Sequence, residues 1–289
     1  MNIVVFGTGG KGTGYKGYSI ALYFAKYYKV TIVEDSREKI DKINGNLILN
    51  REKEIVEYFN NGSFSLEATE DVSVVEKADM IFICLPTDGK AGMLDTRKVE
   101  WVFDTIHSYS LKKGVPIIIK STVPVGFTTK MINRYSNKNI LFSPEFLRIG
   151  HSYNDLRNPK KLIVGRADDS DAEKAAKLFS KIYKCKADKE PVVLFTLPEE
   201  AEVIKLACNS YSALRSCFMS DIFKLSKKLE LDYAKIEEGI YLQEASRLGG
   251  NNSSDTAGYE PLVGVSQLSE LCQDSSDSIL KFISSLYVG

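Results

Sequence analysis

A glycine-rich segment near the N-terminus constrains the fold of this chain more than any other feature. An apolar run, NIVVF, precedes it, a helical pattern follows it, and a second apolar run, VTIVE, ends at Glu34. Such a strand–loop–helix unit needs glycines, because one makes the tight turn, one lets the backbone approach a pyrophosphate and one lets the helix pack on the strand. The segment therefore predicts the first β–α–β unit of a Rossmann-type dinucleotide-binding domain.

The GxGxxG fingerprint occurs here in two overlapping copies, made by Gly7, Gly9, Gly12, Gly14 and Gly17. The first copy has the right distance from the preceding strand, and the second has the right distance to the acid at position 34. Either the turn carries five extra residues, or the helix starts about one turn earlier and contains Gly14 and Gly17. Each glycine inside a helix costs about 1 kcal/mol of stability. The sequence leaves both alternatives open, so all five glycines are candidate cofactor ligands.

Glu34 is the second candidate cofactor ligand, because an acid at the end of the second strand can accept hydrogen bonds from an adenosine ribose. An acid there disfavours a 2′-phosphate, so we expect NAD rather than NADP. The segment is not a nucleoside-triphosphate loop, since the GxxxxGK[ST] spacing fails at both Lys11 and Lys16.

Apolar strand patterns alternate with amphipathic helix patterns as far as residue 197. Examples of the strands are DMIFICLPT, VPIIIKST and VVLFTL, and examples of the helices are DTRKVEWVFDTIHSYS and DAEKAAKLFSKIY. This alternation predicts an α/β fold with a mainly parallel sheet. Within the first of these helices we interpret Trp101 and Phe103 as core residues and His107 as a surface residue.

A long helix is predicted to follow this alternation. Pro198, Glu199 and Glu200 are typical of a helix start, and apolar residues then recur at three- and four-residue steps as far as Leu229. The pattern covers about 30 residues, or about 45 Å of helix. A helix of that length is unusual in a globular domain and commonly joins two domains or forms a dimer seam. A short helix, DYAKIEEGIYL, and a polar, glycine-rich loop come after it.

Lys205 and Asn209 are four residues apart on this helix and therefore share a face. A lysine and an amide together can hold a sugar hydroxyl, a phosphate or a water molecule. The alternative is a solvated lysine beside a surface amide, and this stretch alone favours that interpretation.

Composition excludes several classes of protein. Lys and Arg total 38, as do Asp and Glu, so nothing points to nucleic acid or an anionic membrane as a partner. The five cysteines lack metal-binding spacing and there are only two histidines, so we expect no metal site. No basic segment follows Met1 and no apolar run is long enough to span a bilayer, which predicts a cytoplasmic protein with free thiols.

Four motifs, GTGYKG, KSTVPVGFT, SPEFLR and EAEVIKLACNSYSALR, occur in the order in which the UDP-glucose/GDP-mannose dehydrogenase family has them. The chain resembles this family over nearly its whole length, which corresponds to about the first two-thirds of a family member. Members oxidise the C6 alcohol of a nucleotide sugar to a carboxylate with two NAD+. The resemblance implies an oxidoreductase fold, NAD as cofactor, and a nucleotide sugar or small sugar as ligand.

The resemblance also implies roles for individual residues. Lys205 and Asn209 stand where the family keeps its catalytic lysine and asparagine, and Thr122 stands near the nicotinamide and the reactive water. Glu145 matches the family glutamate that handles protons together with the lysine and water, and Thr87 matches a threonine beside the cofactor. Without the resemblance, Glu145 would be interpreted as an acid near a helix N-cap.

The chain departs from the family pattern at its covalent chemistry. The family's nucleophilic cysteine adds to the aldehyde, and the resulting thiohemiacetal gives up the second hydride. Here Glu260 stands at or near that position, with Val263 and Gly264 in place of the lysine and aspartate that follow it. Ile149 replaces a glutamate that contacts cofactor in the family. A carboxylate cannot replace the thiolate, so we expect no four-electron oxidation to a uronic acid.

These observations support two hypotheses of different class. In the first, the chain is a diverged, catalytically impaired member, a pseudoenzyme or a binding or regulatory partner. In the second, it is an NAD-dependent dehydrogenase that carries out one alcohol-to-carbonyl step, with Lys205, Glu145 and ordered water handling the proton. A third possibility is a truncated gene product whose fold outlives its function.

The expected organisation is an NAD-binding domain over residues 1–197 and a central-helix region over residues 198–289. The short helical C-terminal region is expected to pack on the central helix, and the family's C-terminal UDP-binding domain is expected to be absent. We also expect a homodimer formed through the central helix.

Overall fold

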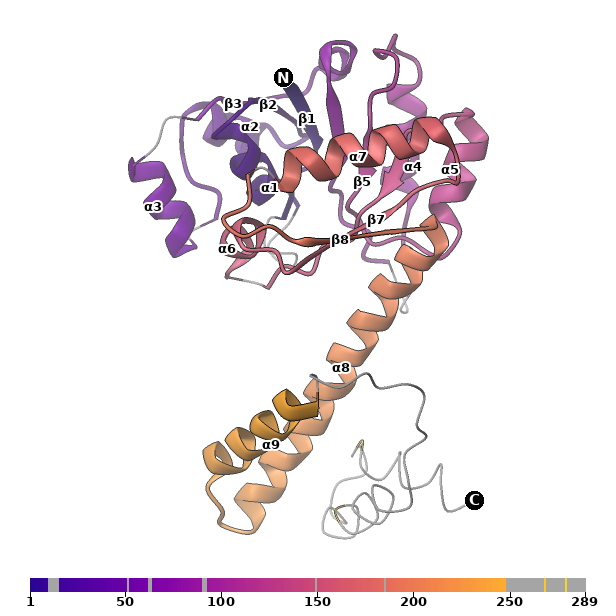
Figure 1. Cartoon of the computed structure of the whole chain (residues 1–289). Coiled ribbons are helices and arrows are strands. Elements are labelled where there is room, and N and C mark those ends of the chain that lie inside the picture. The colour runs from indigo at the N-terminus through magenta and orange to yellow at the C-terminus, as the bar shows by residue number, and fades with distance from the viewer. Residues whose placement is uncertain are drawn as a thin grey trace. The chain divides into compact units, whose positions relative to one another are not determined.

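The computed structural model describes residues 1–9, 16–50, 52–61, 64–89, 93–148, 150–184, 186–247, 268 and 279. The chain divides into two compact units, Met1–Leu206 and Ala207–Gly289. Figure 1 shows the chain with its helices and strands labelled.

The first unit is built on a sheet that has eight strands within the described residues, in the order β3-β2-β1-β4-β5-β6-β7-β8. All neighbouring strands run parallel except β6 and β7, which pair antiparallel. The mainly parallel α/β sheet predicted from the sequence is thus confirmed. The strands are β1 (Asn2–Phe6), β2 (Lys29–Val33), β3 (Leu66–Thr69), β4 (Met80–Ile83), β5 (Ile117–Ile119), β6 (Ile140–Phe142), β7 (Lys161–Gly165) and β8 (Val192–Thr196).

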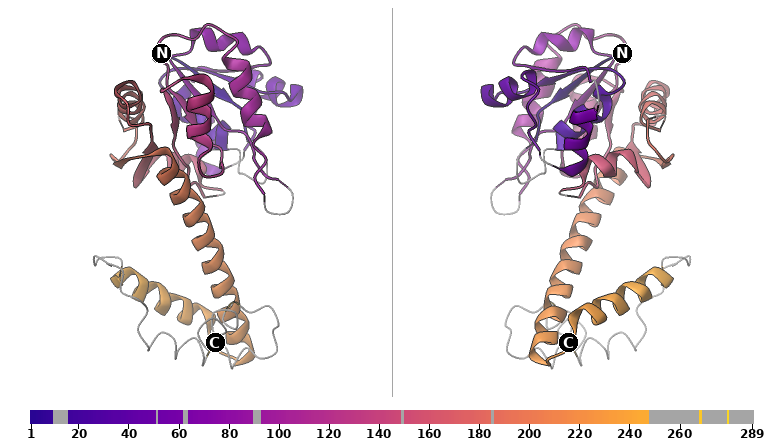
Figure 2. Two further views of the ribbon diagram at one scale, coloured as in Figure 1. Left: turned by 90° about the vertical axis from the view of Figure 1, so that its right-hand side faces the viewer. Right: turned by 90° about the vertical axis from the view of Figure 1, so that its left-hand side faces the viewer.

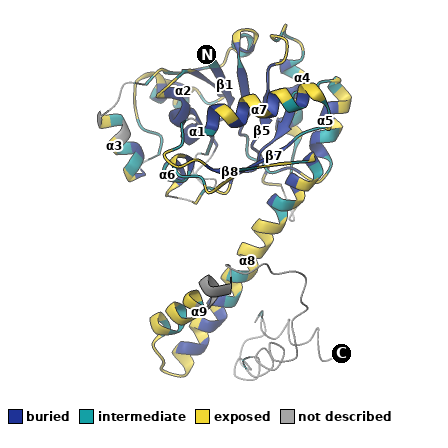
Figure 3. Ribbon diagram, in the orientation of Figure 1, coloured by how far each residue is buried: buried dark blue, intermediate teal, exposed yellow. Residues whose placement is uncertain are grey.

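Helices cover both faces of this sheet. Because successive side chains along a strand point to opposite faces, each strand contributes to two cores. Ile3 and Val5 of β1 belong to a core with α1 and α7, and Val4 and Phe6 belong to a second core with α4 and α5 (Figure 2). The central strands are therefore buried on both sides, as Figure 3 shows. The helices of this unit are α1 (Lys16–Ala25), α2 (Arg37–Asn44), α3 (Lys53–Asn61), the 3-10 helix η2 (Val72–Lys77), α4 (Arg97–Ile106), α5 (Phe127–Tyr135), α6 (Ser152–Arg157) and α7 (Ser170–Lys184).

The interpretation of α4 from the sequence was only partly right. Phe103 is fully buried, as expected, but Trp101 is 56% exposed and is not a core residue. It lies two positions before Phe103 on the helix, on the side that faces away from the core. The ring of His107 is partly buried and stacks on Tyr135 with ring centres 4.1 Å apart.

The predicted long helix is confirmed as α8 (Pro198–Lys228), which has 31 residues. Its first turn packs closely on the sheet at Gly165 of β7, where a Cβ atom would lie 2.8 Å from the Cβ of Ala201 and 2.9 Å from the Cα of Pro198. This close approach holds the start of α8 against the carboxyl end of the sheet.

The second unit contains the remainder of α8 together with α9 (Tyr233–Arg247). Helix α9 begins near the start of the predicted short helix, DYAKIEEGIYL, and extends beyond its predicted end. The rings of Phe223 and Tyr233 meet edge to face with centres 5.1 Å apart. The guanidinium of Arg215 lies 4.9 Å from the centre of the Tyr241 ring. None of the helices in the described part of the chain combines the length and apolar sequence needed to cross a bilayer.

Candidate cofactor and active site

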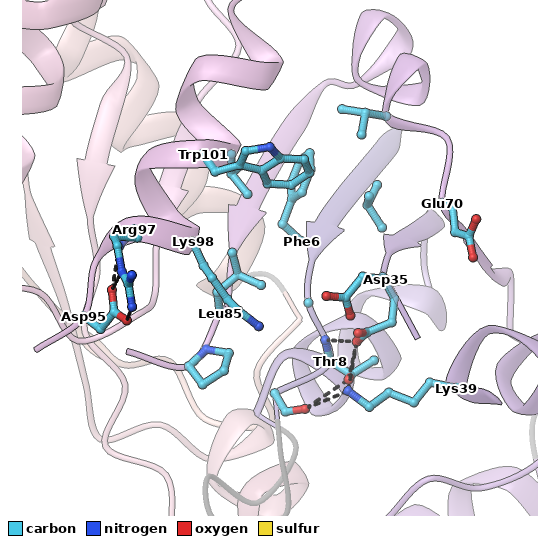
Figure 4. A pocket seen from close by; sticks show the side chains of 17 residues that line it. Phe6, Thr8, Asp35, Lys39, Glu70, Leu85, Asp95, Arg97, Lys98 and Trp101 are labelled. Carbon is cyan, nitrogen blue, oxygen red and sulfur yellow. Dashed lines mark hydrogen bonds and ion pairs between the residues drawn. The ribbon is translucent and has the colours of Figure 1, made fainter. Parts of the chain in front are cut away.

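A cavity of about 860 Å³ lies at the carboxyl ends of β1, β2 and β4. The order of the sheet reverses between β1 and β4, and open α/β sheets bind their ligands at such a point. Figure 4 shows Trp101 and Lys98 reaching in from α4, with Asp35 and Lys39 on the side of β2. The volume is within the range of small-molecule sites.

The turn after β1 depends on glycine at two described positions. Gly7 has φ +82°, and a Cβ atom there would lie 2.6 Å from Cδ2 of Leu85. A Cβ atom at Gly17, in α1, would lie 2.1 Å from the carbonyl oxygen of Gly7 and 2.8 Å from the Cβ of Cys84. Gly7 therefore permits the turn and Gly17 permits α1 to approach the strand ends. Gly9 lines the cavity, and Gly12 and Gly14 lie outside the described residues.

Glu34 lies at the end of β2, buried at the wall of the cavity. The amide and hydroxyl of Thr8 donate to its Oε2 at 3.0 and 2.6 Å, and Nζ of Lys39 lies 3.3 Å from the same oxygen. Burial acts to raise the pKa of this carboxyl, but the hydrogen bonds from Thr8 and the charge of Lys39 outweigh it and lower the pKa. The side chain is therefore an ionised acceptor beside the cavity.

Thr87 and Thr122 are brought together from the loops after β4 and β5. The hydroxyl of Thr87 donates to the carbonyl oxygen of Thr122 at 2.7 Å. Thr87 is buried and Thr122 is partly buried. The hydrogen bond ties together two of the residues selected from the sequence.

Glu145 and Lys205 also meet, although not through the carboxylate. Glu145 follows β6 and is 5% exposed, and Lys205 on α8 is 6% exposed. Nζ of Lys205 donates to the main-chain carbonyl oxygen of Glu145 and lies 5.0 Å from the centre of the Phe146 ring. The lysine is thus buried beside the acid, which contradicts the interpretation of Lys205 as a solvated side chain.

Lys120 lies beside Glu145, and the sequence reasoning did not select it. Its Nζ is 3.7 Å from Oε1 of Glu145, and the two side chains are 3% and 4% exposed. A lysine directly after the wholly apolar run of β5 is the sequence signal that could have found it. Burial raises the pKa of Glu145, opposed by the positive charges of Lys120, Lys16 and Lys205, in that order. Burial likewise lowers the pKa of Lys120.

Glu202, also on α8, is a further buried acid, and the sequence reasoning did not select it. It accepts hydrogen bonds from the amide of Gly126 at 2.6 Å and from the amide and hydroxyl of Thr128 at 2.8 and 2.6 Å. These donors form the start of α5, so Glu202 caps that helix and joins it to α8. Lys205 comes three residues later, and this joint therefore helps to place it.

The structure does not test the other predicted positions. Asn209 is exposed on α8 and belongs to the second unit, and its role stays a prediction. Ile149, Glu260, Val263 and Gly264 lie outside the described residues. In the described part of the chain, no three His, Cys, Asp or Glu side chains lie together in an arrangement that could hold a metal ion.

Comparison with known proteins decides the family. Residues 1–184 match the model of the UDP-glucose/GDP-mannose dehydrogenase family, NAD binding domain. The chain belongs to this family. The cofactor expected from the sequence, NAD, is thereby confirmed, and so is the Rossmann-type fold.

This family member is 31% identical over 254 residues to UDP-glucose 6-dehydrogenase of Campylobacter jejuni, covering 86% of this chain and 62% of that protein. It is also 31% identical over 253 residues to UDP-glucose 6-dehydrogenase of Streptococcus pneumoniae, covering 86% of this chain and 63% of that protein. The chain thus spans about three-fifths of the length of these relatives. In fold it resembles GDP-mannose dehydrogenase from Pseudomonas aeruginosa, with a TM-score of 0.75 and 24% identity over 95% of this chain and 65% of that one.

The described residues of this family member fit a dinucleotide. Gly7 has no side chain, and a Cβ atom there would clash, so a pyrophosphate can approach the backbone at this position. Glu34 places an ionised oxygen at the wall of the cavity, and the apolar side chains of Leu85 and Val102 line the same cavity. The cavity therefore offers apolar surface for a base and polar groups for a ribose.

Proposed function

We propose that this chain binds NAD and does not complete the four-electron oxidation of a nucleotide sugar, so that it serves as a pseudoenzyme with a binding or regulatory role. The observation that carries the proposal is the cavity beside the ionised Glu34, combined with a sequence that has Glu260 at or near the family's cysteine position. The first supports retention of the cofactor site. The second supports loss of the covalent step.

The second oxidation has a chemical requirement that a glutamate does not meet. That step needs a sulfur nucleophile whose adduct with the aldehyde carries a C–H bond from which hydride can leave. A glutamate carboxylate is a poor nucleophile toward an aldehyde and a good leaving group, so its adduct reverts. The next cysteine in the sequence is Cys272, which lies outside the described residues.

Two contacts favour a second candidate function, a two-electron oxidation of an alcohol to a carbonyl. Thr87 meets Thr122, and Lys205 meets Glu145. Bound NAD+ would supply the hydride acceptor. Lys205 and Glu145 would hold the hydroxyl or an ordered water and take up its proton. This candidate predicts an active enzyme that stops at the aldehyde or ketone.

Cofactor binding is tested by titration with NAD+ and NADP+, followed by calorimetry and by the emission of Trp101, the single tryptophan of the chain. Trp101 lines the cavity, so NAD+ should change its emission. NADP+ should bind at least about tenfold more weakly, because its 2′-phosphate would approach Glu34 and like charges about 4 Å apart repel by a few kcal/mol near a protein surface. No heat and no change of emission with NAD+ would overturn the proposal.

Turnover separates the two candidate functions. The protein is incubated with NAD+ and UDP-glucose, and the NADH formed per sugar is measured. No NADH supports the pseudoenzyme, one NADH per sugar supports the two-electron enzyme, and two per sugar contradict both. Any turnover should be lost in Lys205→Ala and kept in the matched control Lys181→Ala, whose lysine is exposed on α7.

We further propose a homodimer formed through the second unit's part of α8. The support is its exposed apolar surface, since Tyr211, Leu214 and Phe223 are 64%, 52% and 44% exposed. Light scattering at micromolar concentration should give twice the chain mass of 32.3 kDa. A monomer mass, or a dimer that survives Leu214→Glu unchanged, would contradict this interface.

A further inference from the structure

A buried ion pair lies beside the proposed active-site residues, and neither the motifs nor the family comparison assigns it a role. Nζ of Lys120 is 3.7 Å from Oε1 of Glu145, with both side chains almost fully buried. Oε1 accepts no hydrogen bond among the described residues. A buried charge is costly unless a partner compensates it, so each of these groups depends on the other for its charge.

The ammonium of Lys120 is held from three further directions. It donates to the hydroxyl of Ser143 at 3.3 Å. Two aromatic rings of α7 face it, with the ring centres of Phe179 and Tyr183 at 5.8 and 6.0 Å. A cation that faces rings and a hydroxyl in a buried site keeps its position better than one on a flexible surface chain.

The groups that face Glu145 come from five elements: Lys120 after β5, Lys205 on α8, Lys16 on α1, Cys84 after β4 and Tyr183 on α7. Lys205 donates a hydrogen bond to the main-chain carbonyl oxygen of Glu145, whereas Lys120 lies within ion-pair distance of the carboxylate. Burial raises the pKa of the carboxyl, and Lys120 is the largest of the charges that oppose this rise.

We propose that Lys120 is a positioning residue that keeps the buried Glu145 carboxylate ionised and fixed in direction. An acid that is already protonated cannot take up a proton, so the pair decides whether Glu145 can act as a base. The catalytic consequence rests on the two-electron function proposed above. The effect of Lys120 on the charge of Glu145 does not, and it can be measured without cofactor or substrate.

The first test is infrared spectroscopy at neutral pH of the natural chain, of Lys120→Met, of Glu145→Gln and of the variant that carries both substitutions. Lys120→Met should show the carbonyl stretch of one protonated carboxylic acid that the natural chain lacks. That band should be absent from the double variant, which assigns it to Glu145. Lys130→Met is the matched control, because Lys130 pairs with Glu100 at 3.2 Å on the surface and its loss should create no such band.

The second test follows urea unfolding of the same proteins. Lys120→Met should lower the midpoint, and the loss should grow as the pH rises through the raised pKa of Glu145, because the unfolded chain releases that proton at lower pH. The double variant should recover most of the loss, since it buries neither charge. If Lys120→Met does not fold, recovery of a folded protein in the double variant supports the proposal in the same way.

Two results would contradict the role proposed for Lys120. The proposal is overturned if Lys120→Met shows no new carbonyl band, or if the double variant is as unstable as the sum of the two single variants. Absence of NAD+ binding would overturn the proposed function alone, because neither test uses the cofactor. If turnover is found, Lys120→Met should move the acidic limb of the pH profile to higher pH, which a merely structural defect would not do.

Discussion

The carboxylate of Glu202 on α8 accepts two hydrogen bonds from Thr128 at the start of α5, from its amide at 2.8 Å and from its hydroxyl at 2.6 Å. The same carboxylate accepts a hydrogen bond from the amide of Gly126 at 2.6 Å. Thr122 lies just before this turn and Lys205 just after Glu202. The cap therefore links the two segments that carry these candidate residues.

Replacement of Glu202 by alanine should lower the free energy of unfolding by about 1–3 kcal/mol, because three donors lose a buried charged acceptor. Urea unfolding followed by circular dichroism measures the change. The control is Glu173→Ala on α7, whose surface pair with Lys177 should contribute only about 0.2–0.5 kcal/mol. An effect of Glu202→Ala no larger than the control would show that the cap adds nothing to stability.

Replacement of Glu34 by glutamine should weaken NAD+ binding by about 10- to 100-fold, because hydrogen bonds to a charged acceptor are stronger than those to an amide. Calorimetry measures the dissociation constant. Unchanged affinity would mean that the ribose does not reach this side chain.

The same variant should change how stability depends on pH. The folded pKa of Glu34 is lowered, so its contribution is present above the ordinary glutamate value of 4.5 and is lost as the pH falls through the lowered value. Glu34→Gln should therefore be less sensitive to acid over that window than the natural chain. Urea midpoints measured between neutral and acidic pH follow this, and parallel curves for the two proteins would contradict it.

A Cβ atom at Gly17 should not be tolerated, because it would lie 2.1 Å from the backbone oxygen of Gly7. Gly17→Ala should cost about 3 kcal/mol or more, at or above the upper end for overpacking, and should weaken NAD+ binding through movement of α1. The matched control is Gly239→Ala in α9, where a Cβ meets nothing within 4 Å. That change should stabilise the chain by about 0.5–1 kcal/mol. Similar effects of the two substitutions on the unfolding midpoint would contradict the predicted clash at Gly17.

The thiol of Cys84 should react slowly in the folded protein. Burial is the main cause that raises its pKa, and the charge of Glu145 acts in the same direction. Cys208 and Cys217 are exposed, so iodoacetamide should label them first, and Cys84 should be labelled only after addition of denaturant. Peptide mass spectrometry after timed labelling gives the order, and early labelling of Cys84 would contradict its burial.

Much of the fold followed from local patterns in the sequence. The glycine segment, the strand–helix alternation and the apolar periodicity of α8 each depend on neighbouring residues, so they predicted the Rossmann-type sheet and the long helix. The four motifs predicted the family and the cofactor. They also selected Glu145 and Lys205, which the structure buries side by side.

The contacts that give these residues their chemistry were decided only by the tertiary structure. The partners Glu202 and Thr128 are 74 residues apart, and Lys120 meets Glu145 because β5 and β6 are neighbours in the sheet. Trp101 was assigned to the core because its helical pattern did not show which face the sheet would cover. Periodicity and motifs report what a segment can form, whereas the charge state of a buried acid depends on which side chains folding brings beside it.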